Sequence, residues 1–354
     1  MRRKEDVVRG AAAGIAMAAT VPYLTLKLLW LSGSPVGARD AKALDGLWTL
    51  NLLTFGMEVV ALLLALAFVR PWGWRAPAAL VAFPMWVATG LLGTILVVVP
   101  LDLLGSLVFG AEHRTAAQQA DDGLAGWVYA VVYGGFGVQG AALFTAFALY
   151  ARRRWTSLLH DRIGDLPDSP TRNVQRAFAA VAALVALGVA TARAYWAAGG
   201  TVGLPLRMAE EYDRSMATMD AATAVTAVAA ALALLVLVFR IGPRRRLRVP
   251  LLVAWTGAGS LFGWGGFLLV AFGTSTTVPD LPRAVPGFLA LVEAGQFTAG
   301  ALILAAGAVA LTERGAAPGR GAGPDGTDGT DDRSRTDGPR GTDGPGGADV
   351  KSPG

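Results

Sequence analysis

Residues 47–69 read LWTLNLLTFGMEVVALLLALAFV, and Glu58 is the only charged side chain among these 23 residues. An α-helix rises about 1.5 Å per residue, so this stretch is long enough to cross the roughly 30 Å of hydrocarbon in a bilayer. A helix is the expected form, because lipid offers no hydrogen-bond partner to unpaired backbone groups. The stretch predicts a transmembrane helix with a carboxyl group near its midpoint.

The rest of the chain repeats this pattern. Further apolar runs of similar length cover residues 7–31, 77–99, 124–150, 174–198, 221–239, 251–272 and 286–311. The 354 residues are 53% hydrophobic and 16% charged, with a mean hydropathy of +0.47, whereas soluble domains carry about 25% charged residues. The predicted fold is therefore an all-α, polytopic transmembrane helical bundle of about eight helices, and the lipid bilayer is its expected partner.

The distribution of positive charge predicts the orientation in the membrane. The net charge is +5, which by itself would also suit nucleic acid. With the N-terminus in the cytoplasm, however, the cytoplasmic segments before the C-terminal tail hold seventeen Lys and Arg residues and the opposite side holds six. Because these residues concentrate in cytoplasmic loops, we expect both termini in the cytoplasm and no nucleic-acid partner. Arginine outnumbers lysine 27 to 4, a bias typical of high-GC bacteria, so a bacterial plasma membrane is the expected location.

Several kinds of catalytic or cofactor site are excluded or disfavoured. The chain has no cysteine, and His113 and His160 fall on opposite sides of the predicted membrane, so they cannot ligate one metal ion together. The GxGxxG pattern at 135–140 lies inside an apolar helix and not in a soluble βαβ unit. We interpret it, like the small-residue face at 259–263, as close helix packing. The sequence therefore predicts no catalytic residue, no metal and no cofactor.

An internal duplication divides the chain. Segment 27–37 places a cation, Trp, Gly, Val and Gly at the same spacing as segment 193–203, and the offset is 166 residues. Each half would contain four helices, an even number, so both halves would insert in the same direction as parallel repeats. The predicted boundaries are 1–155 for the first four-helix repeat, 156–173 for a cytoplasmic linker, 174–314 for the second repeat and 315–354 for a disordered cytoplasmic tail.

Residues 195–204, YWAAGGTVGL, carry a resemblance to a known group. They resemble the signature of uncharacterised four-helix membrane proteins of actinobacteria, in which a basic residue or His precedes a Tyr-Trp-Ala-Leu-Gly-Gly stretch at the end of a helix. The resemblance implies a four-helix architecture that is duplicated in this chain. It implies no activity, because that family has none established.

Five polar side chains within the predicted spans form a candidate intramembrane polar site, consisting of Lys27, Glu58, Gln139, Arg193 and Glu293. A charge near the bilayer centre costs about 2.5–3.5 kcal/mol on insertion scales, so each needs a partner or a task. Arg193 and Glu293 lie at matching depth and are expected to form an ion pair. Alternatively, Lys27 and Arg193 reach the outer headgroups. Glu58 reaches neither surface and is either neutral or paired with Lys27, in a structural role or as a proton or substrate site. Gln139 is expected to bond between helices.

The segments outside the spans add two expectations. The outer loops are acidic, with Asp102 and Asp220 counted among their solvated carboxylates. Trp30 and Trp196 fall at outer ends of spans and are expected in an interfacial aromatic belt.

The leading functional hypothesis is a non-enzymatic membrane protein with an accessory or sensory role for a membrane protein partner, of open oligomeric state. The alternative is a small-solute or proton-coupled transporter that uses Glu58.

Overall fold

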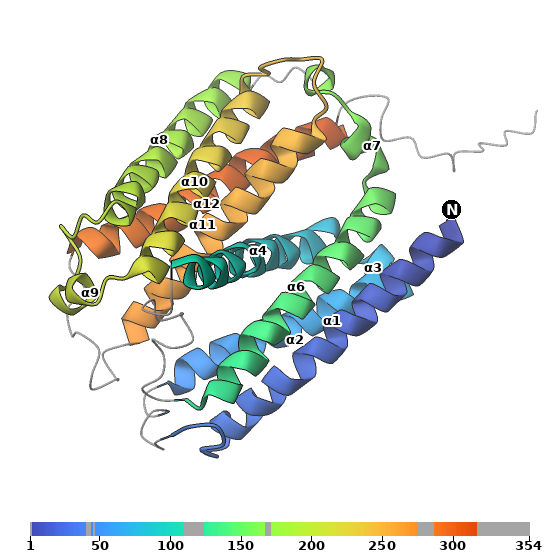
Figure 1. Cartoon of the computed structure of the whole chain (residues 1–354). Coiled ribbons are helices and arrows are strands. Elements are labelled where there is room, and N and C mark those ends of the chain that lie inside the picture. Colours follow the sequence, from blue (N-terminus) through green and yellow to red (C-terminus); the bar gives the residue numbers. More distant parts are fainter. Residues whose placement is uncertain are drawn as a thin grey trace, which may run out of the picture. The chain divides into compact units, whose positions relative to one another are not determined.

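The computed structural model describes residues 2–39, 44, 47–109, 124–166, 171–274 and 287–316. In these ranges the structure is built from helices, eight of which are long and apolar enough to cross a membrane. They are α1 (Arg2–Leu31), α2 (Trp48–Val69), α4 (Ala78–Phe109), α6 (Gly126–Arg154), α8 (Arg172–Ala197), α10 (Arg214–Val238), α11 (Arg248–Thr274) and α12 (Gly287–Ala316) (Figure 1). The predicted all-α, polytopic bundle is confirmed.

Short elements join the long helices. We call the end of the bundle at which α1 begins the N-terminal face and the other end the opposite face. The N-terminal face carries α3 (Pro71–Arg75), α7 (Thr156–His160) and a 3-10 turn, η3 (Ile163–Asp165), whereas α9 (Leu206–Glu210) lies at the opposite face. Because these short elements lie at the two faces, each long helix crosses the bundle once between them.

The buried side chains form two main clusters, one in each half of the chain. The first unites α1, α2, α4 and α6 around Phe68, Met85 and Tyr150. The second unites α8, α10, α11 and α12, and alanine supplies most of it. Small side chains allow helix backbones to approach closely, which is the usual basis of helix association in lipid. Trp86 of α4 also belongs to the second cluster, so α4 packs against both halves.

The two halves meet where α4 crosses α11. A Cβ atom added at Gly90 would overlap the carbonyl group of Gly259, and one added at Gly259 would overlap the carbonyl oxygen of Trp86. Beside this contact the hydroxyl oxygens of Thr94 and Ser260 lie 2.8 Å apart. The predicted packing role of the small residues at 259–263 is confirmed, and the partner of this face is the third long helix of the other half.

The sequence duplication corresponds to a repeated local structure. After α1, the indole Nε1 of Trp30 donates a hydrogen bond to the carbonyl oxygen of Val36 at 2.8 Å. After α8, Nε1 of Trp196 donates to the carbonyl oxygen of Val202 at 3.0 Å. Both indoles are buried, so the expected placement of these two tryptophans in an interfacial belt is wrong. Each indole instead closes the turn that follows its helix.

Glycine makes these two turns possible. Gly33 and Gly199 have φ values of 86° and 92°, and Gly37 and Gly203 have φ values of 78° and 84°. Residues with a Cβ rarely adopt this left-handed region, whereas glycine adopts it readily. The recurrence of both glycines 166 residues apart is therefore a requirement of the same backbone path.

Two helices extend beyond their predicted ends, and this corrects the placement of two carboxylates. α10 begins at Arg214, seven residues before the predicted start, and Asp213 caps it by accepting a hydrogen bond from the backbone nitrogen of Met216 at 3.0 Å. α4 continues through Pro100 to Phe109. Asp220 and Asp102 consequently lie within helices and not in solvated loops.

The chain from Met1 to Arg314 forms one compact unit. The predicted repeats therefore lie in one packed body, joined at the contact between α4 and α11. Residues 317–354, which make up nearly all of the predicted tail, lie outside the described residues, as do residues 110–123, which include His113, and residues 275–286.

Candidate intramembrane polar site

Arg193 is the centre of a buried polar group in the second half. Its Nη1 donates to Oδ1 of Asp220 at 2.8 Å, and its Nη2 donates to Oε1 of Glu293 at 2.5 Å and to Oε1 of Gln296 at 2.9 Å. The four residues come from α8, α10 and α12, and each is at most 8% exposed. The expected ion pair between Arg193 and Glu293 is confirmed, and Asp220 extends it to a second carboxylate.

Tyr212, in the segment between α9 and α10, completes this group. Its hydroxyl donates to Oδ2 of Asp220 at 2.8 Å. Burial, and next the hydrogen bond to Asp220, raise the pKa of the Tyr212 phenol above its usual value of 10.0. The phenol therefore stays a hydrogen-bond donor at neutral pH. We call Arg193, Asp220, Glu293, Gln296 and Tyr212 the Arg193 hub.

The Arg193 hub contains fewer positive charges than carboxylates. Asp220 and Glu293 face a single guanidinium group. The second carboxylate oxygen of Glu293, Oε2, is buried and has no hydrogen-bond partner among the described residues. A buried polar atom without a partner costs about 1–3 kcal/mol, and more when it is charged. The hub therefore has room for one more positive charge or hydrogen-bond donor at Oε2.

The first half holds two smaller polar contacts. Lys27 of α1 donates from Nζ to Oδ1 of Asn51 in α2 at 2.7 Å. Gln139 of α6 donates from Nε2 to Oε2 of Glu58 in α2 at 2.9 Å. All four side chains are buried. The predicted inter-helix bond of Gln139 is confirmed, whereas the described residues show no Lys27–Glu58 ion pair.

Both cations point into the bundle. The Nζ atom of Lys27 lies 5.0 Å from the ring centroid of Trp30, and the guanidinium carbon of Arg193 lies 5.5 Å from that of Trp196. Lys27 is 6% exposed and Arg193 is 8% exposed. The alternative in which these two side chains reach the outer headgroups is therefore wrong. Partners on neighbouring helices and the ring of the following Trp hold them inside.

The two halves place similar groups at similar positions. In each half the cation comes from the last turns of the first long helix, and its partner, Asn51 or Asp220, lies in the first two turns of the second. The fourth long helix supplies a glutamine, Gln139 or Gln296. The halves differ in their acidic residues. The partner of the cation is the neutral Asn51 in the first half and the acidic Asp220 in the second. Only the first half has an acidic residue, Glu58, midway along its second long helix.

The five predicted site residues thus fall into three separate contacts: Lys27 with Asn51, Glu58 with Gln139, and Arg193 with Glu293 in the Arg193 hub. Four of their partners lie outside the predicted site, namely Asn51, Asp220, Gln296 and Tyr212. Asp220 lies in α10 and not in the predicted loop, because the helix begins seven residues before its predicted start. Asp213 followed by Arg-Ser-Met is an acceptable N-cap sequence, and it was the signal that would have placed Asp220 one and a half turns inside α10.

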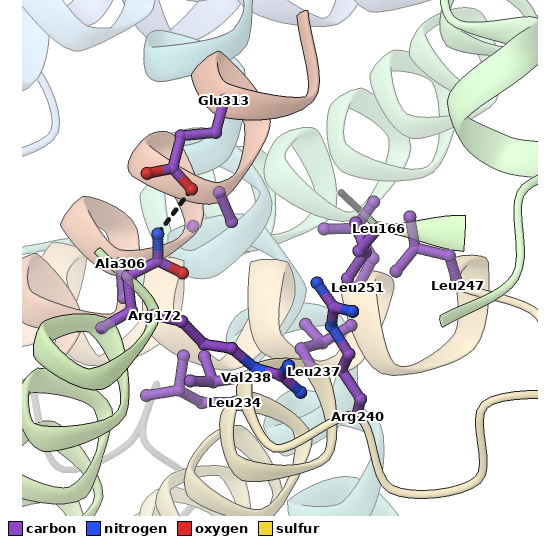
Figure 2. Close-up of a pocket in the computed structure, with 13 residues that line it drawn as sticks. Leu166, Arg172, Leu234, Leu237, Val238, Arg240, Leu247, Leu251, Ala306 and Glu313 are labelled. Carbon is purple, nitrogen blue, oxygen red and sulfur yellow. Dashed lines mark hydrogen bonds between the residues drawn. The ribbon is translucent and has the colours of Figure 1, made fainter. Parts of the chain in front are cut away.

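A cavity lies at the N-terminal face of the second half, among α8, α10, α11 and α12 (Figure 2). Apolar residues, such as Leu234, Leu251 and Ala306, form most of its wall. Gln175 donates from Nε2 to Oε2 of Glu313 at 2.6 Å beside it. None of the five predicted site residues lines this cavity.

Comparison with known proteins identifies no family for this chain. The chain matches no family model, no curated protein and no solved structure. Within the described ranges, no group of three or more His, Cys, Asp or Glu side chains is arranged to hold a metal ion. Eight apolar helices and three buried polar groups therefore characterise a multi-pass membrane protein.

Proposed function

We propose that the chain is a non-enzymatic membrane protein with a sensory or accessory role, located in a bacterial plasma membrane with both termini in the cytoplasm. The Arg193 hub is its signal-receiving element, and the signal is a proton taken up from the opposite face. The observation that carries the proposal is the buried Oε2 atom of Glu293, which has no hydrogen-bond partner among the described residues.

A proton at this atom would balance the hub. With both carboxylates ionised, Asp220 and Glu293 exceed the single charge of Arg193 by one. A proton on Oε2 of Glu293 removes that excess and leaves one ion pair. The remaining groups of the hub, the amide of Gln296 beside Arg193 and the phenol of Tyr212 beside Asp220, stay neutral.

The position of the hub connects this event to the packing of helices. Arg193, Asp220 and Glu293 belong to three different helices, α8, α10 and α12, and Tyr212 belongs to the segment that leads into α10. A change in the strength of the Arg193–Glu293 contact therefore alters how α12 is held against α8. Such a local change in charge is a common basis for a switch between two packings.

The test measures the thermal unfolding midpoint of the purified protein in detergent between pH 5 and pH 9. We expect the midpoint of the wild type to change with pH and that of Glu293→Gln to change less, because the amide imitates the protonated carboxyl group. Glu210→Gln, which removes a carboxylate from an exposed side chain outside the Arg193 hub, is the control and should keep the wild-type pH response. An unchanged pH response in Glu293→Gln would reject the proposal.

The accessory role has its own test. Crosslinking in native membranes should recover the same partner repeatedly, and the yield should change with pH for the wild type but not for Glu293→Gln. Recovery of no reproducible partner would leave a sensor that acts alone.

Glu58 supports a second candidate, a small-solute or proton-coupled transporter. Its carboxyl group is 5% exposed, lies midway along α2 and accepts a hydrogen bond from Gln139 across the bundle. In liposomes, the transporter hypothesis expects substrate-dependent flux that Glu58→Gln abolishes. The resemblance of residues 195–204 to actinobacterial four-helix membrane proteins stays a prediction.

A further inference from the structure

An apolar groove runs between α10 and α11 near the N-terminal face. Along α10 its wall consists of residues spaced as one helical face, including Ala229, Leu232 and Val236, and along α11 it includes Val249 and Val253. Leu232 is 56% exposed and Val249 is 60% exposed. In a protein that spans a membrane, these side chains contact lipid.

Three arginines line the same groove. Arg245, Arg246 and Arg248 are exposed, and none of them forms an ion pair with another described residue. Arg248 is also the first residue of α11. The unpaired backbone N–H groups of the first helical turn and the positive end of the helix dipole therefore lie at the same end of the groove. This combination favours an anion.

The segment that carries the arginines is held in place by the linker between the two halves. The backbone nitrogen of Ile163 donates to the carbonyl oxygen of Arg245 at 3.0 Å, and that of Leu247 donates to the carbonyl oxygen of Asp161 at 2.9 Å. Arg162 and Arg246 form an antiparallel bridge. The fixed backbone presents the guanidinium groups beside the groove, and Ile163 lines its end.

We propose that this groove binds one anionic phospholipid from the leaflet next to the N-terminal face. The phosphate contacts Arg245, Arg246 and Arg248, and an acyl chain lies against α10 and α11. Basic pockets between transmembrane helices are a recognised form of anionic lipid site. An anionic phospholipid accounts for both the charge and the apolar wall of the groove. A free phosphate would contact only the arginines, and a neutral lipid would contact only the apolar wall.

The experiment uses the full-length protein in detergent and native mass spectrometry. Phosphatidylglycerol, phosphatidylcholine or inorganic phosphate is titrated separately. Each arginine beside an anionic lipid contributes a factor of about five to binding, so replacing all three by Gln should weaken the phosphatidylglycerol adduct about a hundredfold. The matched control replaces Arg3, Arg70 and Arg75 by Gln, which removes the same charge from exposed positions at the same face, and should behave like the wild type.

A groove-filling variant separates lipid from free phosphate. Ala229→Phe keeps the three arginines and should weaken the phosphatidylglycerol adduct, because the acyl chain loses its place. If the triple variant is poorly folded, Arg245→Gln and Arg248→Gln singly should each lower binding about fivefold. Equal loss in the control triple variant, equal binding of phosphatidylcholine, or inorganic phosphate binding with no effect of Ala229→Phe would each overturn the proposal.

Discussion

Gly90 of α4 and Gly259 of α11 approach so closely that a Cβ atom at Gly90 would overlap the carbonyl group of Gly259. Because α4 and α11 are the third long helices of the two halves, this contact joins the halves through backbone atoms. Gly90→Ala should destabilise the protein by about 1–3 kcal/mol, as expected for overpacking. Gly56→Ala is the control, since an added Cβ there meets nothing within 4 Å. Thermal unfolding in detergent tests both, and an equal midpoint for the two variants would contradict this interface.

The paired tryptophan turns provide a second prediction. Trp30→Phe and Trp196→Phe each remove one indole N–H and leave the carbonyl oxygen of Val36 or Val202 without its donor. Each change should cost about 1 kcal/mol of unfolding free energy, and the double variant should lose the sum. Trp48→Phe, at a side chain that is 58% exposed, should be neutral. If only one of the two turns responds, the halves are not equivalent at this point.

Replacing Arg193, the cation of the hub, should strongly destabilise the protein, and neutralising its two carboxylate partners as well should restore most of the stability. Arg193→Met leaves Asp220 and Glu293 buried without their partner and should destabilise the fold by about 3–5 kcal/mol. Combining it with Asp220→Asn and Glu293→Gln removes the uncompensated charges and should recover most of this loss.

The first half provides the comparison for this series. Lys27→Met should cost less, because the partner of Lys27 is the neutral Asn51. The measurement is the denaturation of four proteins in the same detergent: the wild type, Arg193→Met, the triple variant and Lys27→Met. A triple variant no more stable than Arg193→Met alone would show that shape, and not charge, is what Arg193 supplies.

Tyr212 makes a pH-dependent contribution. Its pKa is raised by burial and by the hydrogen bond to Asp220, so the folded protein keeps this phenol protonated above pH 10. The stability from the Tyr212–Asp220 bond is therefore present below the ordinary phenol pKa and is lost as the pH rises through the folded value. Between pH 9 and pH 11, the tyrosinate absorbance of the folded wild type should equal that of Tyr212→Phe. A larger absorbance increase in the wild type would contradict the assignment.

The sequence by itself determined the membrane class, the eight helices and the repeated turn. Apolar runs of about twenty residues have one stable form in lipid, a helix, so composition and length were enough. The Trp and Gly spacing at 27–37 and 193–203 identified the same turn twice, because left-handed backbone positions restrict residue type locally. The Arg193–Glu293 pair was also predictable, since two opposite charges at one depth in lipid have strong reason to meet.

The tertiary structure decided which side chains share a site. It moved Asp220 from a loop to the Arg193 hub, paired Lys27 with Asn51 in place of Glu58, and turned both cations inward. It also brought the arginines after α10 beside a lipid-facing groove. None of these follows from helix periodicity, because the partner of an intramembrane polar group depends on how each helix is rotated and on which neighbours it meets. Those choices are made by packing across the bundle, where small residues such as Gly90 and Gly259 set how closely the helices approach.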